Sequence, residues 1–544
     1  MTLFPHALQR FIASIGLLLC ALATLPAAAA EASADANATA ACAALMKQNF
    51  FDIPDAPTSL LSTAIVPATD NLPAYCRVVG TIAPQVGFEV GLPLANWNGR
   101  LMMQGCGGTC GVRSLAGCED MLSRNFAVTF TDMGHTGRPL LGGLWAQGNL
   151  PAVIDFGYRA THVTMVAAKV IQQAFYGRAA QYSYFRGCST GGRQAMVEAQ
   201  RFPDDFDGIV SIAPPLDETG VTAMHLAWTT RAASLRDGSR IIDANDVKRV
   251  HAAAVAACDM TDGARDGVIG NPAACRWSVA ELGCRAGKAS AAADGAPCLS
   301  DEKVQAFQKI YDGVRDAKGR RIYPGGLWLG SELTWLDYFV STNDEPAHLL
   351  DPNWIVGEFF RYLAFWQTPG AFGVYDFDYE RDTGRLGLME AIYSATNPDL
   401  RRFKARAGKL ILVGGMADPL IPVPSLIDYH QTVTRLMGGP AATDDFFRMF
   451  LVPGMEHCVG GVGPDAIDYV GALMAWVERG EAPDRLVGAH LPKPQSMLRY
   501  ARHPLPGGAA EWTRPVFAYP GSAVYGGKGD WRDAANWSRG RVTP

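Results

Sequence analysis

The stretch Gly187-Cys188-Ser189-Thr190-Gly191 decides the fold of this chain, because it fits the G-x-S-x-G pattern of a nucleophile elbow. The residues before it, 182–185, are mostly aromatic and predict a short buried strand, and residues 193–199 after it predict a helix. A strand, a sharp turn and a helix are the context in which this motif pushes a serine hydroxyl out over the edge of a sheet. The sequence therefore predicts an α/β fold with Ser189 as a candidate nucleophile.

Two stretches downstream of Ser189 supply an acid and a base. Residues 409–418 form an aliphatic run that ends in glycines and Asp418, and they predict a buried strand with a carboxylate at its C-terminal end. A second strand is predicted over 446–452, and His457 follows it. The chain order serine, aspartate, histidine is that of the α/β-hydrolases. We expect His457 to carry the proton of Ser189 and Asp418 to orient the imidazole; the alternative is a turn cap and a loop histidine.

A glycine-rich loop, residues 105–111, follows a predicted strand ahead of the nucleophile. This is the position of the loop that donates to the oxyanion in α/β-hydrolases. We expect the backbone N–H of Thr190 to be one donor and that of Gly107 or Gly108 to be the other. No Gly-Lys-Ser/Thr follows and no dinucleotide fingerprint is present, so a phosphate cradle is disfavoured; a structural turn is the alternative.

Ser189 and His457 each have a cysteine as immediate neighbour, Cys188 and Cys458. A bond between these cysteines would hold the serine and the histidine in one small volume. The paired Cys-Ser and His-Cys motif, together with Asp418, resembles the tannase and feruloyl esterase family, which includes bacterial mono(hydroxyethyl) terephthalate hydrolase. The resemblance runs from about residue 42 to about residue 537. It implies an α/β-hydrolase core, ester hydrolysis, and a disulfide between Cys188 and Cys458 under the triad.

The resemblance also implies further disulfides, which pair Cys42 with Cys76, Cys258 with Cys275, and Cys284 with Cys298. Three other cysteines remain outside the N-terminal leader; we pair Cys110 with Cys118, which leaves Cys106 as a free thiol. The family usually has one more disulfide near the C-terminus, but Phe517 and Arg539 occupy its two positions. We therefore expect the C-terminal tail to pack without a covalent link, through Tyr519, Tyr525, Trp531 and Trp537.

An acidic loop over residues 258–269 is a candidate calcium site. Its three aspartates are spaced by three and four residues among glycines, and carboxylate oxygens are the ligands that calcium requires. The pattern is not that of an EF-hand. The resemblance implies that the loop holds structural Ca²⁺ in the lid, through the side chains of Asp259, Asp262 and Asp266 and the carbonyls of Ala264 and Val268. The alternative is a solvated acidic turn.

The N-terminal segment, residues 1–30, predicts a secretory signal peptide. Arg10 precedes an apolar run over 11–25, and four alanines follow before Glu31. The run is too short and too poorly flanked to predict a membrane span. Export would place the chain in the periplasm or outside the cell, where cysteines are expected to be paired.

Composition and spacing set the domain organisation. The chain has 544 residues, 48% of them hydrophobic, and its net charge of −5 without a basic run argues against nucleic acid as a partner. More than two hundred residues separate Ser189 from Asp418, so an inserted domain must occupy much of that interval. We place the α/β-hydrolase domain at 31–215 and 401–544, and a lid domain at 216–400.

The lid contains a section dense in aromatic residues, a few of which we expect to face the substrate and stack on a planar aromatic acyl group. These residues are Trp328, Trp335, Tyr338, Phe339, Trp354, Phe359, Phe360, Tyr362, Phe365, Trp366 and Phe372. Arg361 in the same section is a candidate for holding a substrate carboxylate, and a surface salt bridge is its favoured alternative. Asp132 and His135 end a strand near the active-site edge but precede the nucleophile, so we interpret them as loop-shaping residues.

These observations predict a secreted serine esterase that cleaves small esters of aromatic acids through an acyl-enzyme. The feruloyl, galloyl and terephthalate monoester types stay open. An acyltransferase or a peptidase on the same core would share the triad, whereas a non-catalytic binding protein would not need it.

Overall fold

The computed structural model describes residues 37–137, 141–284, 297–336, 338–342, 347–367, 372–492 and 510–541. The predicted signal peptide lies outside the described residues. None of the described helices combines the length and the apolar character that crossing a membrane requires.

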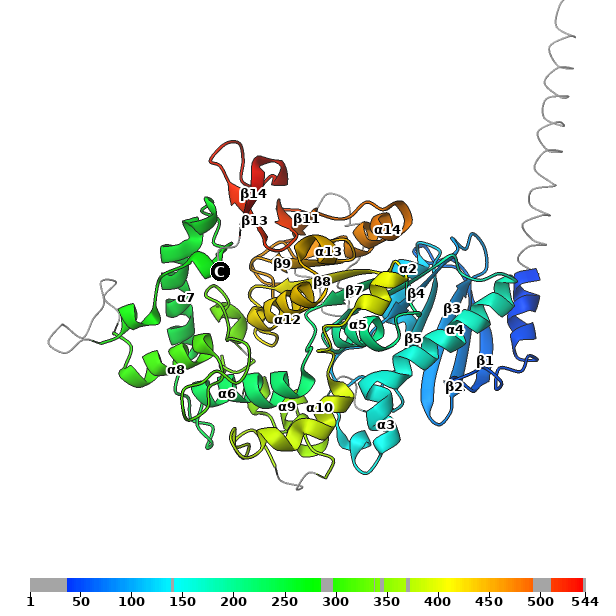
Figure 1. Cartoon of the computed structure of the whole chain (residues 1–544), viewed down its shortest axis with the longest axis horizontal. Coiled ribbons are helices and arrows are strands. Elements are labelled where there is room, and N and C mark those ends of the chain that lie inside the picture. Colours follow the sequence, from blue (N-terminus) through cyan, green and yellow to red (C-terminus); the bar gives the residue numbers. More distant parts are fainter. Residues whose placement is uncertain are drawn as a thin grey trace, which may run out of the picture.

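A nine-stranded sheet forms the centre of the molecule, in the order β1-β2-β3-β5-β4-β6-β7-β8-β9 (Figure 1). The first three strands and β5 pair antiparallel, and from β5 onward each neighbour pairs in parallel. The parallel strands are buried along almost their whole length, as strands covered on both faces must be. The strands are β1 Thr58–Val66, β2 Tyr75–Ile82, β3 Val86–Pro93, β4 Arg100–Gln104, β5 Ala127–Thr131, β6 Tyr182–Cys188, β7 Gly208–Ile212, β8 Lys409–Gly415 and β9 Phe447–Val452.

Helices cover both faces of this sheet. The hydroxyl of Tyr184 in β6 donates to Glu478 of α14, whereas the next residue, Phe185, packs on Phe206 after α5. Because neighbouring residues of a strand point to opposite faces, α14 and α5 lie on opposite sides. This is the predicted α/β-hydrolase core. Its helices are α2 Glu119–Leu122, α3 Leu150–Ile154, α4 Ala160–Tyr176, α5 Thr190–Arg201, α11 Arg401–Ala405, α12 Val423–Leu436, α13 Pro440–Asp444 and α14 Tyr469–Arg479.

The lid is helical in its described part. The chain leaves the sheet after β7 and returns to it at β8, and the range predicted for the lid falls within this interval. The aromatic section supplies the lid's own core: Trp335, Phe339 and Phe360 are fully buried. The lid helices are α6 Ala227–Ala233, α7 Ala244–Cys258, α8 Asp301–Asp312, α9 Ile355–Glu358 and α10 Gly387–Tyr393, with π-helical turns η4 Gly220–Leu226 and η10 Phe359–Leu363.

The C-terminal segment links the core to the lid. Strands β10 Ala466–Ile467, β11 Arg485–His490 and β12 Trp512–Phe517 form a small antiparallel sheet, and β13 Gly521–Tyr525 pairs with β14 Trp537–Arg541. Trp537 is buried and its ring lies 5.6 Å from that of Tyr525. Arg514 of β12 reaches the acidic loop after α7, and Figure 1 shows the β13–β14 hairpin above that helix.

Four of the predicted disulfides are present, between Cys42 and Cys76, Cys188 and Cys458, Cys258 and Cys275, and Cys284 and Cys298. The predicted bond between Cys110 and Cys118 is wrong.

Cys110 is instead bonded to Cys106, with their Cα atoms 5.5 Å apart. The left-handed backbone at Gly108 (φ +55°) and at Cys110 (φ +61°) turns the loop back on itself, which brings the two near cysteines together. Cys118 ends a short 3₁₀ helix and is the free thiol among the described residues; it is buried, with its sulfur 3.9 Å from the carbonyl oxygen of Thr129. Burial raises the pKa of Cys118 to about 12, so this thiol stays protonated.

Candidate active site

Ser189 lies at a strained turn between β6 and α5. Its backbone has φ +59° and ψ −125°, a conformation that a non-glycine residue adopts only when its surroundings impose it. The flanking glycines make this turn possible. A Cβ at Gly187 would lie 2.3 Å from the carbonyl oxygen of Gly191, and one at Gly192 would lie 2.4 Å from that of Ile212. The motif predicted from the sequence therefore forms the expected elbow.

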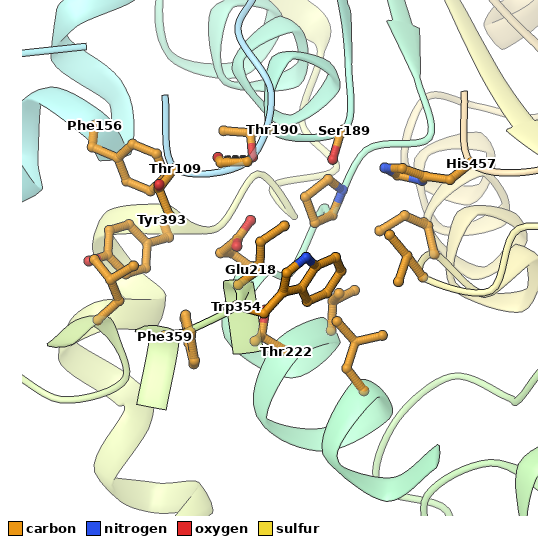
Figure 2. A pocket seen from close by; sticks show the side chains of 18 residues that line it. Thr109, Phe156, Ser189, Thr190, Glu218, Thr222, Trp354, Phe359, Tyr393 and His457 are labelled. Carbon is orange, nitrogen blue, oxygen red and sulfur yellow. Dashed lines mark hydrogen bonds between the residues drawn. The ribbon is translucent and has the colours of Figure 1, made fainter. Parts of the chain in front are cut away.

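Asp418 and His457 form a buried pair beside this elbow. The Nδ1 of His457 lies 2.8 Å from Oδ2 of Asp418, and the two side chains are 4% and 1% exposed. The other carboxylate oxygen of Asp418 accepts the N–H groups of Leu420 (2.8 Å) and Ile421 (3.0 Å). With Nδ1 facing a carboxylate, the imidazole keeps its proton there and leaves Nε2 as the acceptor. Figure 2 shows the His457 ring beside the hydroxyl of Ser189, at the mouth of one cavity.

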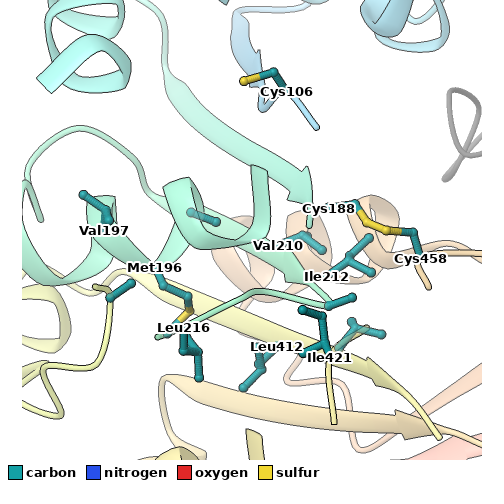
Figure 3. Close-up of a cluster of buried hydrophobic side chains, with 14 of the residues drawn as sticks. Cys106, Cys188, Met196, Val197, Val210, Ile212, Leu216, Leu412, Ile421 and Cys458 are labelled. Atoms are coloured by element: carbon teal, nitrogen blue, oxygen red, sulfur yellow. A yellow bond between two sulfur atoms is a disulfide. The ribbon is translucent and has the colours of Figure 1, made fainter. Parts of the chain in front are cut away.

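The disulfide between Cys188 and Cys458 ties the two halves of this arrangement together. Its cysteines are separated by 270 residues in the chain, and their Cα atoms lie 6.0 Å apart. Both are buried, and Figure 3 shows the bond at the end of β6, next to Ile212 of β7. The covalent link thus joins the residue before the serine to the residue after the histidine.

The glycine-rich loop is held against the start of α5. The hydroxyl of Thr190 donates to the carbonyl of Gly108 at 2.6 Å, and Gly108, Thr109 and Thr190 line the cavity. Gly107 does not line it, and its carbonyl accepts the N–H of Cys110. In the described part of the chain the N–H groups of Thr190 and Gly108 have no acceptor within the protein. Of the two predicted glycines, Gly108 is therefore the one that lines the cavity.

Asp132 and His135 shape the loops around the site, and neither lines the cavity. Asp132 accepts the N–H groups of Gly87 and Gly134, both at 2.9 Å. The Nε2 of His135 lies 2.7 Å from the carbonyl of Thr109, and its ring stacks on Trp145. Burial lowers the pKa of His135 to about 4, so the ring stays neutral and supports the glycine-rich loop.

The cavity lies between the core and the lid. It is partly open to solvent, and residues of both the core and the lid line it. Among the predicted lid aromatics only Trp354 and Phe359 line it; Phe156 and Tyr393 add two rings that the sequence did not single out. The complete lining is Gly108, Thr109, Phe156, Ser189, Thr190, Pro215, Glu218, Val221, Thr222, Leu226, Trp354, Ile355, Phe359, Leu363, Tyr393, Leu420, Ile421 and His457.

Glu218 is a lining residue that sequence reasoning missed. It lies in the loop after β7, at the C-terminal edge of the parallel strands, and Figure 2 shows it near Thr222 and Trp354. Its carboxylate is 3.4 Å from Nε of Arg193, which is itself fully buried. Burial raises the pKa of Glu218, and Arg193 acts against this shift. Its position after a buried strand was the only signal in the sequence that could have pointed to it.

Arg361 does not reach this cavity. It pairs with Glu358 at 3.1 Å, one helical turn earlier, and it lines a different hollow that includes Pro352 and Tyr362. The i, i+3 spacing places the two charges on one face of the helix, so the local ion pair forms. The predicted contact of Arg361 with a substrate carboxylate is corrected accordingly.

The acidic loop lies against the C-terminal segment. Asp262 and Asp266 pair with the guanidinium of Arg514, and Asp259 accepts the N–H groups of Asp266 and Gly267. The carboxylate oxygens face Arg514 and the loop amides, and they do not meet at one point. Burial raises the pKa of Asp262, and it raises that of Asp266 to about 6. Three buried carboxylates and one guanidinium leave an excess of negative charge in this loop, so the residues fit a divalent cation in charge and donor type.

Comparison with known proteins gives consistent matches over most of the chain. A sequence model described as tannase and feruloyl esterase matches residues 70–539. Mono(2-hydroxyethyl) terephthalate hydrolase of Piscinibacter sakaiensis is 33% identical, over 92% of this chain and 91% of that protein. Probable feruloyl esterase B-1 of Aspergillus oryzae is 30% identical, over 85% and 83%. The crystal structure of feruloyl esterase B from Aspergillus oryzae superimposes with a TM-score of 0.78 at 27% identity, and covers 92% of this chain and 100% of that one.

Proposed function

The chain belongs to the tannase and feruloyl esterase family and is a carboxylic ester hydrolase, and from this premise we propose that it cleaves esters of aromatic acids through a serine acyl-enzyme. One observation carries the proposal. The pair of His457 and Asp418, hydrogen-bonded at 2.8 Å, lies beside the strained Ser189, and Ser189 and His457 line one cavity. A strained residue held beside a bonded acid and base is costly to maintain for structure alone.

The chemistry follows from this geometry. Oγ of Ser189 attacks the ester carbonyl while Nε2 of His457 accepts the hydroxyl proton. Asp418 stabilises the imidazolium that forms. The N–H groups of Thr190 and Gly108 donate to the oxyanion of the tetrahedral intermediate. The leaving alcohol then takes the proton from His457, and water releases the acid from Ser189 by the same steps.

The lining of the cavity favours a planar aromatic acyl group. Phe156, Trp354, Phe359 and Tyr393 surround it with four rings from both the core and the lid. Rings of this kind accept a flat acyl group by stacking and edge contacts.

The charge of the cavity favours acyl groups without a negative charge. Among the described lining residues there is no lysine or arginine, and Glu218 is the only carboxylate. A terephthalate monoester would bring a second carboxylate toward Glu218, whereas a ring hydroxyl of a feruloyl or galloyl group could donate to it. We therefore place the substrate among esters of hydroxylated aromatic acids.

A hydrolysis panel followed by mass spectrometry tests this proposal. Methyl ferulate, methyl gallate, chlorogenate and mono(2-hydroxyethyl) terephthalate are each incubated with the wild-type protein and with Ser189→Ala. We expect release of the hydroxylated acids by the wild type and none by the variant. Turnover that survives in Ser189→Ala would reject the nucleophile, and no turnover of any ester would favour a non-catalytic binding protein.

The same panel separates a hydrolase from its alternatives. An alcohol or amine acceptor is added at a concentration well above that of the ester, and the acyl products are identified by mass spectrometry. A hydrolase yields mostly free acid, whereas an acyltransferase yields mostly the transferred ester or amide. Cleavage of a matched amide at a rate similar to that of the ester would point to a peptidase.

We also propose that the acidic loop binds structural calcium. Asp259, Asp262 and Asp266, with the carbonyls of Ala264 and Val268, would hold the ion, which would neutralise the excess negative charge beside Arg514. Treatment with a chelator is expected to lower Tm, and added Ca²⁺ to restore it. Asp259→Asn should lose this response, while Asp237→Asn, at an exposed lid aspartate, should keep it. An unchanged Tm in the chelated wild type would contradict the site.

Export is supported by the leader over residues 1–30 and by the disulfides, which persist in oxidising compartments. We propose a periplasmic or secreted protein. N-terminal sequencing of the protein recovered from the periplasm or medium should begin near Glu31; an intact Met1 would contradict processing.

A further inference from the structure

A second cluster of ligand-type side chains lies outside the catalytic cavity. His162 comes from α4, Glu198 from α5, and Asp205 from the loop between α5 and β7. One ligand atom from each of the three lies within 4.8 Å of those from the other two. None of them lines the cavity that holds Ser189. Three segments of the chain thus bring one imidazole and two carboxylates to a single point.

Glu198 is the unusual member of this cluster. Its side chain is 0% exposed, and neither carboxylate oxygen has a hydrogen-bond partner. Burying a carboxylate without a partner is costly, so such a group calls for a neutralising ligand. Lys169, whose positive charge acts on Glu198, donates to the backbone carbonyls of Asp204 (3.4 Å) and Asp205 (2.6 Å), and no hydrogen bond from it to a carboxylate is found among the described residues. Its ammonium therefore leaves the Glu198 oxygens without a donor.

His162 is already oriented for this point. Its Nδ1 lies 2.6 Å from Oδ2 of Asp205, and its ring stacks on Phe202 with centroids 4.0 Å apart and an interplanar angle of 8°. The stacking fixes the plane of the imidazole, so its nitrogen is held toward the carboxylates. The His162 side chain is 20% exposed, which gives an ion from solvent a route to the buried carboxylates.

We propose that His162, Glu198 and Asp205 bind a divalent transition metal ion of the zinc type. Imidazole nitrogen and carboxylate oxygen are zinc ligands, and three protein ligands leave one position for water. The two carboxylates supply the charge that neutralises the ion. Bound there, the metal ties α4 to α5, the helix that begins immediately after Ser189. The competing arrangement is a proton shared between Glu198 and Asp205, which would satisfy the same oxygens without metal.

Metal titration of the full chain distinguishes these arrangements. The protein is stripped with a chelator, returned to saturating Ca²⁺ so that the acidic loop does not compete, and titrated with Zn²⁺ alone. We expect one equivalent of zinc to be retained after gel filtration, measured by elemental mass spectrometry, and a rise in Tm with zinc concentration. Co²⁺ should bind in its place and give the visible absorption bands of a tetrahedral ion.

Variants locate the ion. His162→Gln and Glu198→Gln are each expected to weaken zinc binding by at least about tenfold, as loss of a ligand should. Asp204→Asn, at an exposed neighbour outside the cluster, should bind as the wild type does. The proposal is overturned if the wild type retains no zinc, or if His162→Gln retains as much as the wild type. His162 is partly exposed, so its variant decides the question even if Glu198→Gln does not fold.

Discussion

The cavity has two walls, a core wall that carries Ser189, Asp418 and His457 and a lid wall that carries Trp354 and Phe359, and the two are built in different ways. On the core side, Ser189, Asp418 and His457 are fixed by the sheet, by a strained turn and by a disulfide, and Asp418 accepts two backbone N–H groups. On the lid side, Trp354 and Phe359 come from short helical turns and line the cavity. The core wall is thus held by backbone geometry and a covalent link, whereas short helical turns present the lid wall.

Removal of the nucleophile should produce the largest effect, because it takes the attacking group out of the core wall. Ser189→Ala is expected to lower kcat/KM for every ester by about 10⁴-fold or more, since the triad acts as one unit. Steady-state kinetics on purified protein measure the loss, and circular dichroism verifies the fold. Activity within tenfold of the wild type would show that another group attacks the ester.

Removal of the active-site disulfide should show how much of the core wall depends on a covalent link. The double variant Cys188→Ser, Cys458→Ser is expected to lose about 2–5 kcal/mol of unfolding free energy, together with part of its kcat. Denaturant unfolding and steady-state kinetics measure the two losses.

The matched control is the lid pair Cys284→Ser, Cys298→Ser, which closes a chain segment of only 14 residues. We expect this control to lose stability while kcat is kept. Equal loss of kcat in both double variants would mean that the bond at 188 and 458 does not position the triad.

Reversing the charge of the cavity should change substrate choice and leave the reaction intact. Glu218→Arg is expected to raise the ratio of terephthalate monoester to ferulate ester hydrolysis by about 10-fold to 100-fold, because a guanidinium pairs with the second carboxylate. Glu218→Gln should give a smaller rise in the same direction. Competition assays by mass spectrometry measure the ratio, and Glu390→Gln, at an exposed lid acid, is the control. An unchanged ratio in both variants would remove Glu218 from substrate recognition.

A change of pH should have the smallest effect on the ratio of terephthalate monoester to ferulate ester hydrolysis. Burial raises the pKa of Glu218, with Arg193 acting against and Asp217 in favour of the shift. As pH falls, Glu218 becomes protonated sooner than an exposed glutamate and loses its charge, so the terephthalate monoester is disfavoured less. The ratio should therefore rise a few-fold toward acid pH in the wild type and stay flat in Glu218→Gln. A flat wild-type profile would place the titration outside the range measured.

The core wall could be predicted from the sequence because its signals are local and ordered along the chain. The elbow at Ser189 needs glycines on both sides, and Asp418 and His457 each follow a buried strand. In a parallel sheet the C-terminal ends of such strands share one edge, so the three residues had to meet. The cysteines beside Ser189 and His457 also predicted that these two residues lie close together.

The lid wall could not be predicted in the same way. Aromatic density does not tell which rings face a ligand, and Trp335 and Phe360 instead fill the lid's core. Arg361 forms an ion pair with Glu358, which helix geometry places three residues earlier on the same face. Glu218 faces the cavity only because the chain turns into the lid at that point. The placements of the aromatic rings and of Glu218 depend on tertiary contacts that no short stretch of sequence encodes, whereas the pair of Arg361 and Glu358 is local.

The link between Cys188 and Cys458 encloses the whole lid in a covalent ring, because every lid residue lies between those two positions in the chain. A protease that nicks the lid once would leave both fragments attached to each other. On a non-reducing gel such a nicked protein would still migrate as one species, and only a reducing agent would release its pieces. A single cut in the lid would thus leave the segments that carry Ser189 and His457 joined.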